Sequence, residues 1–178
     1  MCNIVLETPR LLLRNWQESD LEFFTKMNAN PEVMRYFPDP YSRERTKRLF
    51  EAIQLEFADF NYGLYATEEK ATGLFMGYIG FHRARFAADF CPCVEIGWRL
   101  GSAFWNKGFA TEGASACLEH GFNSLKFNKV YSFTATKNLP SERVMQKIGM
   151  TMDRYFDHPG VPENHPLRPH VLYVATPE

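Results

Sequence analysis

The stretch Val94–Leu125, VEIGWRLGSAFWNKGFATEGASACLEHGFNSL, contains two contrasting patterns joined by a short loop. From Val94 to Leu100, apolar residues alternate with polar residues or glycine, which predicts a strand. From Ala110 onward, apolar and small residues recur at the spacing of one helical face, which predicts a helix. Small residues and aromatics fill the loop Trp105–Ala110 between them. The stretch therefore predicts a strand–loop–helix unit.

The loop that precedes this helix is suited to phosphate binding. A helix that opens out of a loop leaves about four backbone N–H groups without intrahelical partners, and the positive end of its dipole attracts anions. Gly108 has no Cβ, so an anion can approach the backbone there. The nucleotide loop GxxxxGK[ST] and the dinucleotide fingerprint GxGxxG are both absent. Because an ordinary strand–helix packing junction has similar residues, the loop alone leaves both interpretations open.

Length, charge and cysteine spacing limit the classes of function. A chain of 178 residues predicts a single domain, 1–178, with a sizeable core. A net charge of −1 argues against nucleic acid as a partner. We find no secretory signal and no apolar run near the ~20 residues of a membrane span, so we expect a cytoplasmic protein without a membrane partner. Cys2, Cys91, Cys93 and Cys117 lack zinc-site spacing, and we expect reduced thiols and no metal.

The order of elements predicts the fold class. We expect four helices, capped by Ser19, by Ser42, at the loop before Ala110, and at Asn138. The expected strands are Arg10–Arg14, Tyr62–Thr67, Leu74–Ala84, Val94–Leu100, Val130–Thr136, Met152–Phe156 and Val171–Ala175. About seven strands mixed with about four helices indicate an α+β or mixed α/β sheet, neither all-parallel nor a sandwich.

Three separated motifs carry a resemblance to a known family. The loop Trp105–Glu112, WNKGFATE, resembles the pyrophosphate loop Arg/Gln-x-x-Gly-x-Gly/Ala of the GNAT superfamily of N-acetyltransferases. Trp105 departs from the strict first position, but the whole octapeptide is similar to the RimJ/RimL-like branch of ribosomal-protein N-terminal acetyltransferases. The segment Asn138–Gly149 resembles the second cofactor motif, and Thr8–Arg14, TPRLLLR, resembles the start of this branch. The resemblance covers nearly the whole chain and implies the GNAT fold, with a mostly antiparallel mixed sheet.

This resemblance implies acetyl-CoA as co-substrate and a primary amine as acceptor, attacked directly in a ternary complex. The acceptor would be a protein N-terminal α-amino group or a small-molecule amine. The pantetheine arm would lie between the strands Val94–Leu100 and Val130–Thr136. The residues implied in cofactor binding are Ile96, Trp98, Leu100, Trp105, Asn106, Lys107, Gly108, Phe109, Ala110, Thr111 and Asn138. Asn138 is equally typical of a helix cap, and Lys107 of an exposed surface.

Acetyl transfer to an amine needs a base and benefits from a proton donor for the leaving thiolate. The attacking nitrogen must be neutral, although an α-amino group has a pKa of about 8. Glu95 is the candidate base, directly or through one water, and partial burial would raise its pKa. It could instead order the sheet or bind the substrate ammonium. Ser141 is the donor that the resemblance implies, although serine is common in first helical turns. Tyr131 and His82 are held in reserve.

The acceptor site is expected near an aromatic loop that contains Tyr36, Phe37 and Tyr41, with His82 nearby. The histidine- and proline-rich segment His158–His170 would form a wall or lid of the same site, since its spacings match no metal-ligand pattern. A non-catalytic acyl-CoA sensor or interaction module on the same fold is the alternative function. Because a small sheet exposes an edge strand that can pair with another chain, formation of a homodimer is left open.

Overall fold

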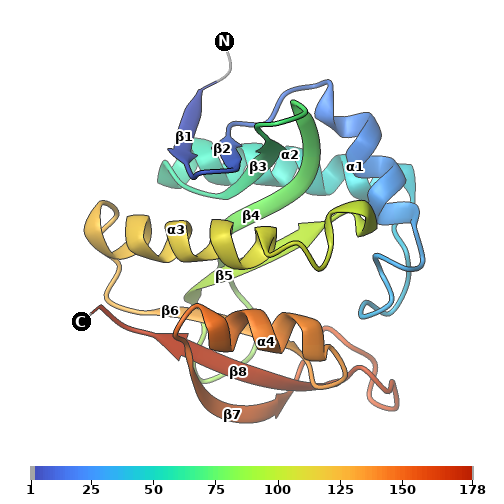
Figure 1. The fold of residues 1–178 in the computed structure, drawn as a ribbon. Coiled ribbons are helices and arrows are strands. Elements are labelled where there is room, and N and C mark those ends of the chain that lie inside the picture. Colours follow the sequence, from blue (N-terminus) through green and yellow to red (C-terminus); the bar gives the residue numbers. More distant parts are fainter. Residues whose placement is uncertain (1–2, 178) are drawn as a thin grey trace.

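The computed structural model describes residues 3–177, and its eight strands form one sheet in the order β1-β2-β3-β4-β5-β6-β8-β7 (Figure 1). The strands are β1 Ile4–Glu7, β2 Leu11–Arg14, β3 Leu64–Glu69, β4 Leu74–Ala84, β5 Cys93–Leu100, β6 Val130–Ala135, β7 Thr151–Asp157 and β8 Pro169–Ala175. The α-helices are α1 Asp20–Ala29, α2 Arg43–Phe60, α3 Phe109–Asn123 and α4 Leu139–Lys147. Only β5 and β6 pair in parallel. The predicted α+β fold with a mixed, mostly antiparallel sheet is confirmed.

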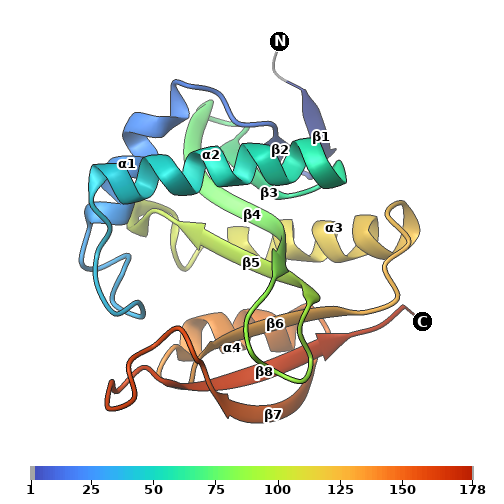
Figure 2. The same ribbon diagram turned by 180° about the vertical axis from the view of Figure 1, so that it is seen from behind.

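Two helices cover each face of the sheet. Figure 1 shows α3 and α4 in front of the strands, and Figure 2 shows α1 and α2 on the opposite face. On the α3 side the core includes Ile79, Ile96, Cys117 and Val130, all fully buried. Gly113 makes this packing possible, because a Cβ at that position would lie 2.5 Å from a methyl group of Ile79. The helix therefore lies directly on β4.

The sheet opens between β5 and β6. Strand β5 pairs with β4 along its whole length, from Cys93 to Leu100. With β6, it pairs through Glu95 and Tyr131 alone among the described residues. Beyond that pair, the buried Ser132 hydroxyl donates a hydrogen bond to the Ile96 carbonyl at 2.9 Å. The two strands therefore diverge toward the end of β5, where the loop to α3 begins.

Two local predictions need correction. Strand β1 was not expected, and the sheet has eight strands rather than about seven. β1 is four residues long and pairs irregularly with β2, so it has too little alternation for a sequence pattern. Ser19 precedes α1 but makes no capping bond with its side chain. The Asp20 carboxylate instead accepts from the Gln17 N–H at 2.8 Å and pairs with the buried Arg14. Ser42 does cap α2, by accepting from the Arg45 N–H at 3.2 Å.

Candidate functional site

The start of α3 presents a row of backbone N–H groups without partners. Gly108 precedes the helix with φ +82°, a left-handed conformation that favours glycine, and Asn106 also has positive φ. No described residue accepts a hydrogen bond from the N–H groups of Asn106 to Thr111, and the next one, that of Glu112, bonds to the Gly108 carbonyl at 3.0 Å. Because unpaired donors at a helix N-terminus attract anions, this loop has the geometry of an anion site.

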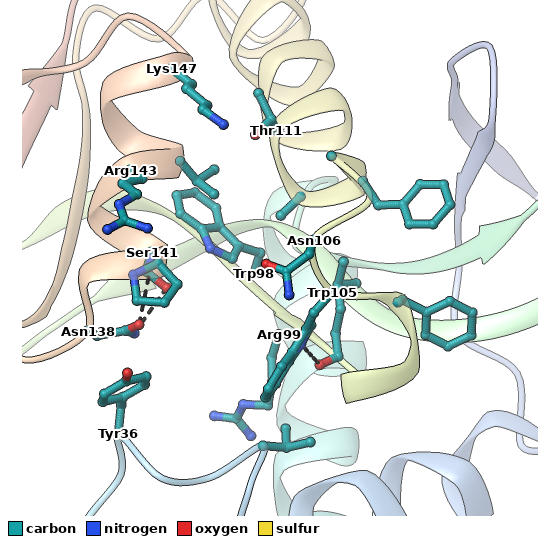
Figure 3. A pocket seen from close by; sticks show the side chains of 18 of the residues that line it. Tyr36, Trp98, Arg99, Trp105, Asn106, Thr111, Asn138, Ser141, Arg143 and Lys147 are labelled. Atoms are coloured by element: carbon teal, nitrogen blue, oxygen red, sulfur yellow. Dashed lines mark hydrogen bonds between the residues drawn. The ribbon is translucent and has the colours of Figure 1, made fainter.

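A cavity of about 410 Å³, which we call the first cavity, lies against this loop (Figure 3). Its walls come from the end of β5, from the loop into α3, from one side of α4 and from the loop before α2. Its cationic lining residues are Arg35, Arg99, Arg143 and Lys147, and none of the described residues that line it is an aspartate or a glutamate. The first cavity is therefore an electropositive site for a ligand with several negative charges.

The segment Thr8–Arg10 holds the loop from behind. The Arg10 guanidinium donates to the Lys107 carbonyl at 2.9 Å and pairs with Glu112 in the first turn of α3 at 2.6 Å. Its Cζ atom lies 4.4 Å from the centre of the Phe109 ring, and the Thr8 hydroxyl also donates to Glu112 at 2.6 Å. The opening motif of the sequence thus fixes the shape of the loop.

Asn138 and Ser141 meet at the start of α4. The Asn138 side-chain oxygen accepts from the Ser141 N–H at 3.4 Å, which caps the helix. Its amide nitrogen donates to the hydroxyls of Ser141 at 3.0 Å and of Thr134 at 2.8 Å. The capping role left open by the sequence is therefore present. Because the Ser141 oxygen accepts from Asn138, its own proton remains free to be donated into the first cavity.

Most of the predicted cofactor residues line the first cavity. They are Trp98, Leu100, Trp105, Asn106, Gly108, Phe109, Ala110, Thr111 and Asn138, together with Ser141, Tyr36 and Phe37. Two others do not line it: Ile96 is fully buried in the core, and the Lys107 side chain is exposed. Lys107 contributes to the loop through its carbonyl, which accepts a hydrogen bond from Arg10 at 2.9 Å.

Glu95 lies on the opposite face of the sheet, in a second cavity of about 440 Å³ beneath α2. His82 and Tyr41 line the same cavity. Burial raises the pKa of Glu95 to about 7; the nearby His82 opposes this rise and the Glu56 carboxylate adds to it. A carboxyl group with that pKa is partly ionised near neutral pH, which suits a general base.

His82 already has a hydrogen-bond partner, Glu56. Its Nδ1 atom lies 2.8 Å from the Glu56 carboxylate, and this hydrogen bond raises the pKa of His82. His82 faces Glu95 across the β4–β5 pairing, while Tyr131 faces Glu95 across the β5–β6 pair. Of the two reserve bases, His82 is therefore already hydrogen-bonded to Glu56, and its charge lowers the pKa of Glu95.

The residue that sequence analysis missed is Arg99. It is 7% exposed and is the residue shared by the linings of the two cavities. In the sequence it occupies a polar position in the alternation of β5, where an exposed side chain is the ordinary expectation. No motif in the sequence marks Arg99 as a buried residue.

The histidine-rich segment has a different environment from the one expected. The rings of His158 and His170 lie 4.9 Å apart at a tilt of 42°, beside Phe86 and Phe156, and line neither of the two cavities. Burial lowers the pKa of both histidines, that of His158 to about 4. The predicted wall or lid therefore finds no support in these cavities.

Residues 3–177 contain no metal-binding cluster, no disulfide and no helix suited to cross a membrane. Among residues 3–177, no cluster of three or more histidine, cysteine or acidic side chains is arranged to hold a metal ion. Cys91, Cys93 and Cys117 are free thiols, and Cys2 lies outside the described residues. No helix in the described part of the chain is both long and apolar enough to cross a bilayer.

Comparison with known proteins gives a consistent result. The family model "Acetyltransferase (GNAT) domain" matches residues 10–151. The chain is similar to the uncharacterized protein YkkB of Bacillus subtilis, with 31% identity over 146 residues, which are 82% of this chain and 84% of that protein. It is 25% identical over 150 residues to spermidine N(1)-acetyltransferase of Escherichia coli, which covers 82% of this chain and 75% of that one.

The fold is also similar to that of a solved structure. RimL, a ribosomal L7/L12 α-N-protein acetyltransferase solved in complex with coenzyme A, superposes with a TM-score of 0.80. The match covers 98% of each chain at 16% identity, so this likeness concerns the fold alone.

Proposed function

Because the chain belongs to the acetyltransferase (GNAT) domain family, we propose that it works as a single domain, 1–178, that transfers acetyl from acetyl-CoA directly to a primary amine. Family membership makes it an N-acetyltransferase, and acetyl-CoA is the co-substrate that the family implies. The acceptor and the roles of individual residues are our proposal. The relatives named for spermidine and for a ribosomal-protein N-terminus have acceptors that share one feature, a primary amine.

The unpartnered N–H groups from Asn106 to Thr111 are the observation that carries the proposal. They lie at the positive end of α3, beside a cavity lined by cations, and these features fit a diphosphate. Arg143 and Lys147 on α4 would add charge for further phosphate oxygens. When bound, acetyl-CoA supplies the acetyl thioester. Trp98 and Leu100 would line its pantetheine arm along the open side of β5.

The proton transfers are assigned to two side chains. Glu95, with a pKa of about 7, would accept a proton from the incoming ammonium, directly or through a water. The Ser141 hydroxyl would donate a hydrogen bond to the departing thiolate, with Asn138 holding its oxygen in place. Tyr36 and Phe37 line the first cavity, as Ser141 does, and would contact the acceptor.

Acetyl-CoA binding and thiol release test the proposal together. We expect acetyl-CoA to raise the melting temperature of the protein and to bind with 1:1 stoichiometry in calorimetry. With a panel of amino acids, peptides and polyamines, we expect release of free CoA that depends on the amine. Glu95→Gln and Ser141→Ala should sharply reduce this release while acetyl-CoA binding persists. Binding without release for any amine would favour a sensor, and absence of binding would refute the assigned site.

A further inference from the structure

Arg99 is buried without an anionic partner. It is 7% exposed, and none of the ion pairs among the described residues includes it. Burial of a cation costs free energy unless charged or polar partners compensate. The other buried arginine, Arg14, shows the usual solution, because it pairs with Asp20 and Glu68. Arg99 therefore differs from a structural arginine in this same chain.

The contacts of Arg99 leave one edge of its guanidinium without hydrogen-bond partners. Nη1 donates to the Asn28 side-chain oxygen at 2.7 Å. The Cζ atom lies over the Phe37 ring at 4.2 Å from its centre, and the ring centres of Tyr41 and Tyr78 lie 5.2 and 5.4 Å away. Aromatic rings stabilise a cation electrostatically, but they do not replace the oxygen acceptors that its N–H groups would otherwise bond to.

Nε is buried without any hydrogen-bond partner, and no described residue accepts a bond from Nη2. These two nitrogens lie on the same edge of the guanidinium. A carboxylate binds such an edge with two parallel hydrogen bonds. The missing partner of Arg99 thus has the shape of a planar, two-oxygen anion.

The position of Arg99 points to the acceptor. It lines both the first cavity and the second, and Figure 3 shows it between Tyr36 and Trp105. It follows Glu95 by four residues on the same strand, so both side chains belong to the same face, about 13 Å apart at the backbone. A molecule of amino-acid size between these two long side chains can present its amine to Glu95 and its acid to Arg99.

We propose that Arg99 binds the carboxylate of the acceptor, and that the acceptor is an amino acid rather than a polyamine. This inference rests on the proposed N-acetyltransferase function. The carboxylate would supply the in-plane acceptors that the buried Nε and Nη2 lack, and it would fix the distance from the amine to Glu95. A polyamine would instead bring a further cation to a cavity already lined by Arg35 and Arg99.

The test compares acceptors that differ only in the carboxylate. CoA release is measured with the common α-amino acids, with their amides and with spermidine, and rates are expressed per concentration of neutral amine. We expect kcat/KM for the best amino acid to exceed that of its amide by about tenfold to a hundredfold. An amide or spermidine used as well as the acid would overturn the inference, while turnover itself would leave the proposed function standing.

Two variants and a control locate the effect. Arg99→Gln should abolish the preference for the acid, and Arg99→Lys, which keeps the charge but not the two-nitrogen edge, should retain only part of it. Arg143→Gln, a change in the same cavity on the cofactor side, should weaken acetyl-CoA binding and leave the preference intact. If neither Arg99 variant folds, the wild-type comparison still decides.

Calorimetry of the same acid and amide pairs, with the CoA-bound protein, separates the two failures. If no amine is acetylated, the proposed catalysis is wrong, but tighter binding of the acid would still support the role of Arg99. Equal binding of acid and amide would refute it.

Discussion

Replacing Glu95 by glutamine should make the protein more stable and less active, each to an extent that depends on pH. The pKa of Glu95 is about 7 in the folded protein, against an ordinary value of 4.5. The folded state therefore holds this proton more tightly than the unfolded state does. Stability is greatest where the group is protonated in both states, and it decreases as the pH rises through the interval from 4.5 to about 7.

The size of the effect follows from the two pKa values. Their difference corresponds to about 3 kcal/mol at pH 8, and to less than about 1 kcal/mol at pH 5. These are upper values, because solvent reaches part of the Glu95 side chain. Glutamine has nearly the same shape and never ionises, so Glu95→Gln removes this cost. We expect the variant to gain up to about 3 kcal/mol over the wild type at pH 8 and little at pH 5.

Urea denaturation at pH 5 and pH 8 measures the gain in stability. CoA release across the same range measures activity, which in the wild type should rise with pH through about 7. In the variant, kcat should fall by about tenfold to a hundredfold, and the rise near pH 7 should disappear. Glu119→Gln, a change at an exposed site on α3, is the control and should alter neither profile.

A gain in stability that is the same at both pH values would refute the burial argument, because it would show that ionisation of Glu95 is not the source. A variant that keeps the wild-type pH profile of activity would show that another group is the base.

Three further changes test the first cavity. Gly108→Ala places a Cβ at φ +82°, which costs about 1–2 kcal/mol in the left-handed region. The free loop can relieve this strain by leaving the conformation that binds the diphosphate, so acetyl-CoA should bind about tenfold more weakly in calorimetry. Unchanged affinity would contradict the loop assignment. Arg10→Met removes a half-exposed ion pair, so the free energy of unfolding should change by less than about 1 kcal/mol. The affinity for acetyl-CoA should nevertheless fall several-fold. The control Lys26→Met removes an exposed ion pair on α1 and should change neither quantity. Ser141→Ala should lower kcat by about tenfold to a hundredfold without raising KM for acetyl-CoA, and Ser141→Thr should restore part of the rate; a purely structural serine would give no such recovery.

The fold was predictable wherever a local pattern decided the element. Strands β4 and β5 alternate or carry long apolar runs, and the start of α4 has an asparagine cap with proline in the first turn, so these elements were found to within a residue or two. Ser19 shows where local patterns fail. The Asp20 carboxylate is drawn to Arg14 on β2, and this tertiary ion pair determines how the chain enters α1.

The site was predictable in part for the same reason. The loop Trp105–Thr111 and the pair Asn138 and Ser141 are contiguous motifs, and they line one cavity because α3 and α4 lie on the same face of the sheet. Arg99 has no motif. Its environment is created by Asn28 and Phe37, which are distant in sequence and unrecognisable as its partners before the chain is folded.

The two groups assigned to proton transfer approach from opposite faces of the sheet. Ser141 lines the first cavity on the α3 and α4 side, whereas Glu95 lines the second cavity beneath α2. They can act on one reacting centre only if the sheet is open between them. Strands β5 and β6 pair at Glu95 and Tyr131 and nowhere else among the described residues, so the opening begins next to the proposed base. If the hydrogen bonds between β5 and β6 continued as far as Trp98, the closed sheet would separate Glu95, the proposed base, from Ser141, the proposed proton donor. The divergence of these two strands is therefore the structural condition for the proposed reaction.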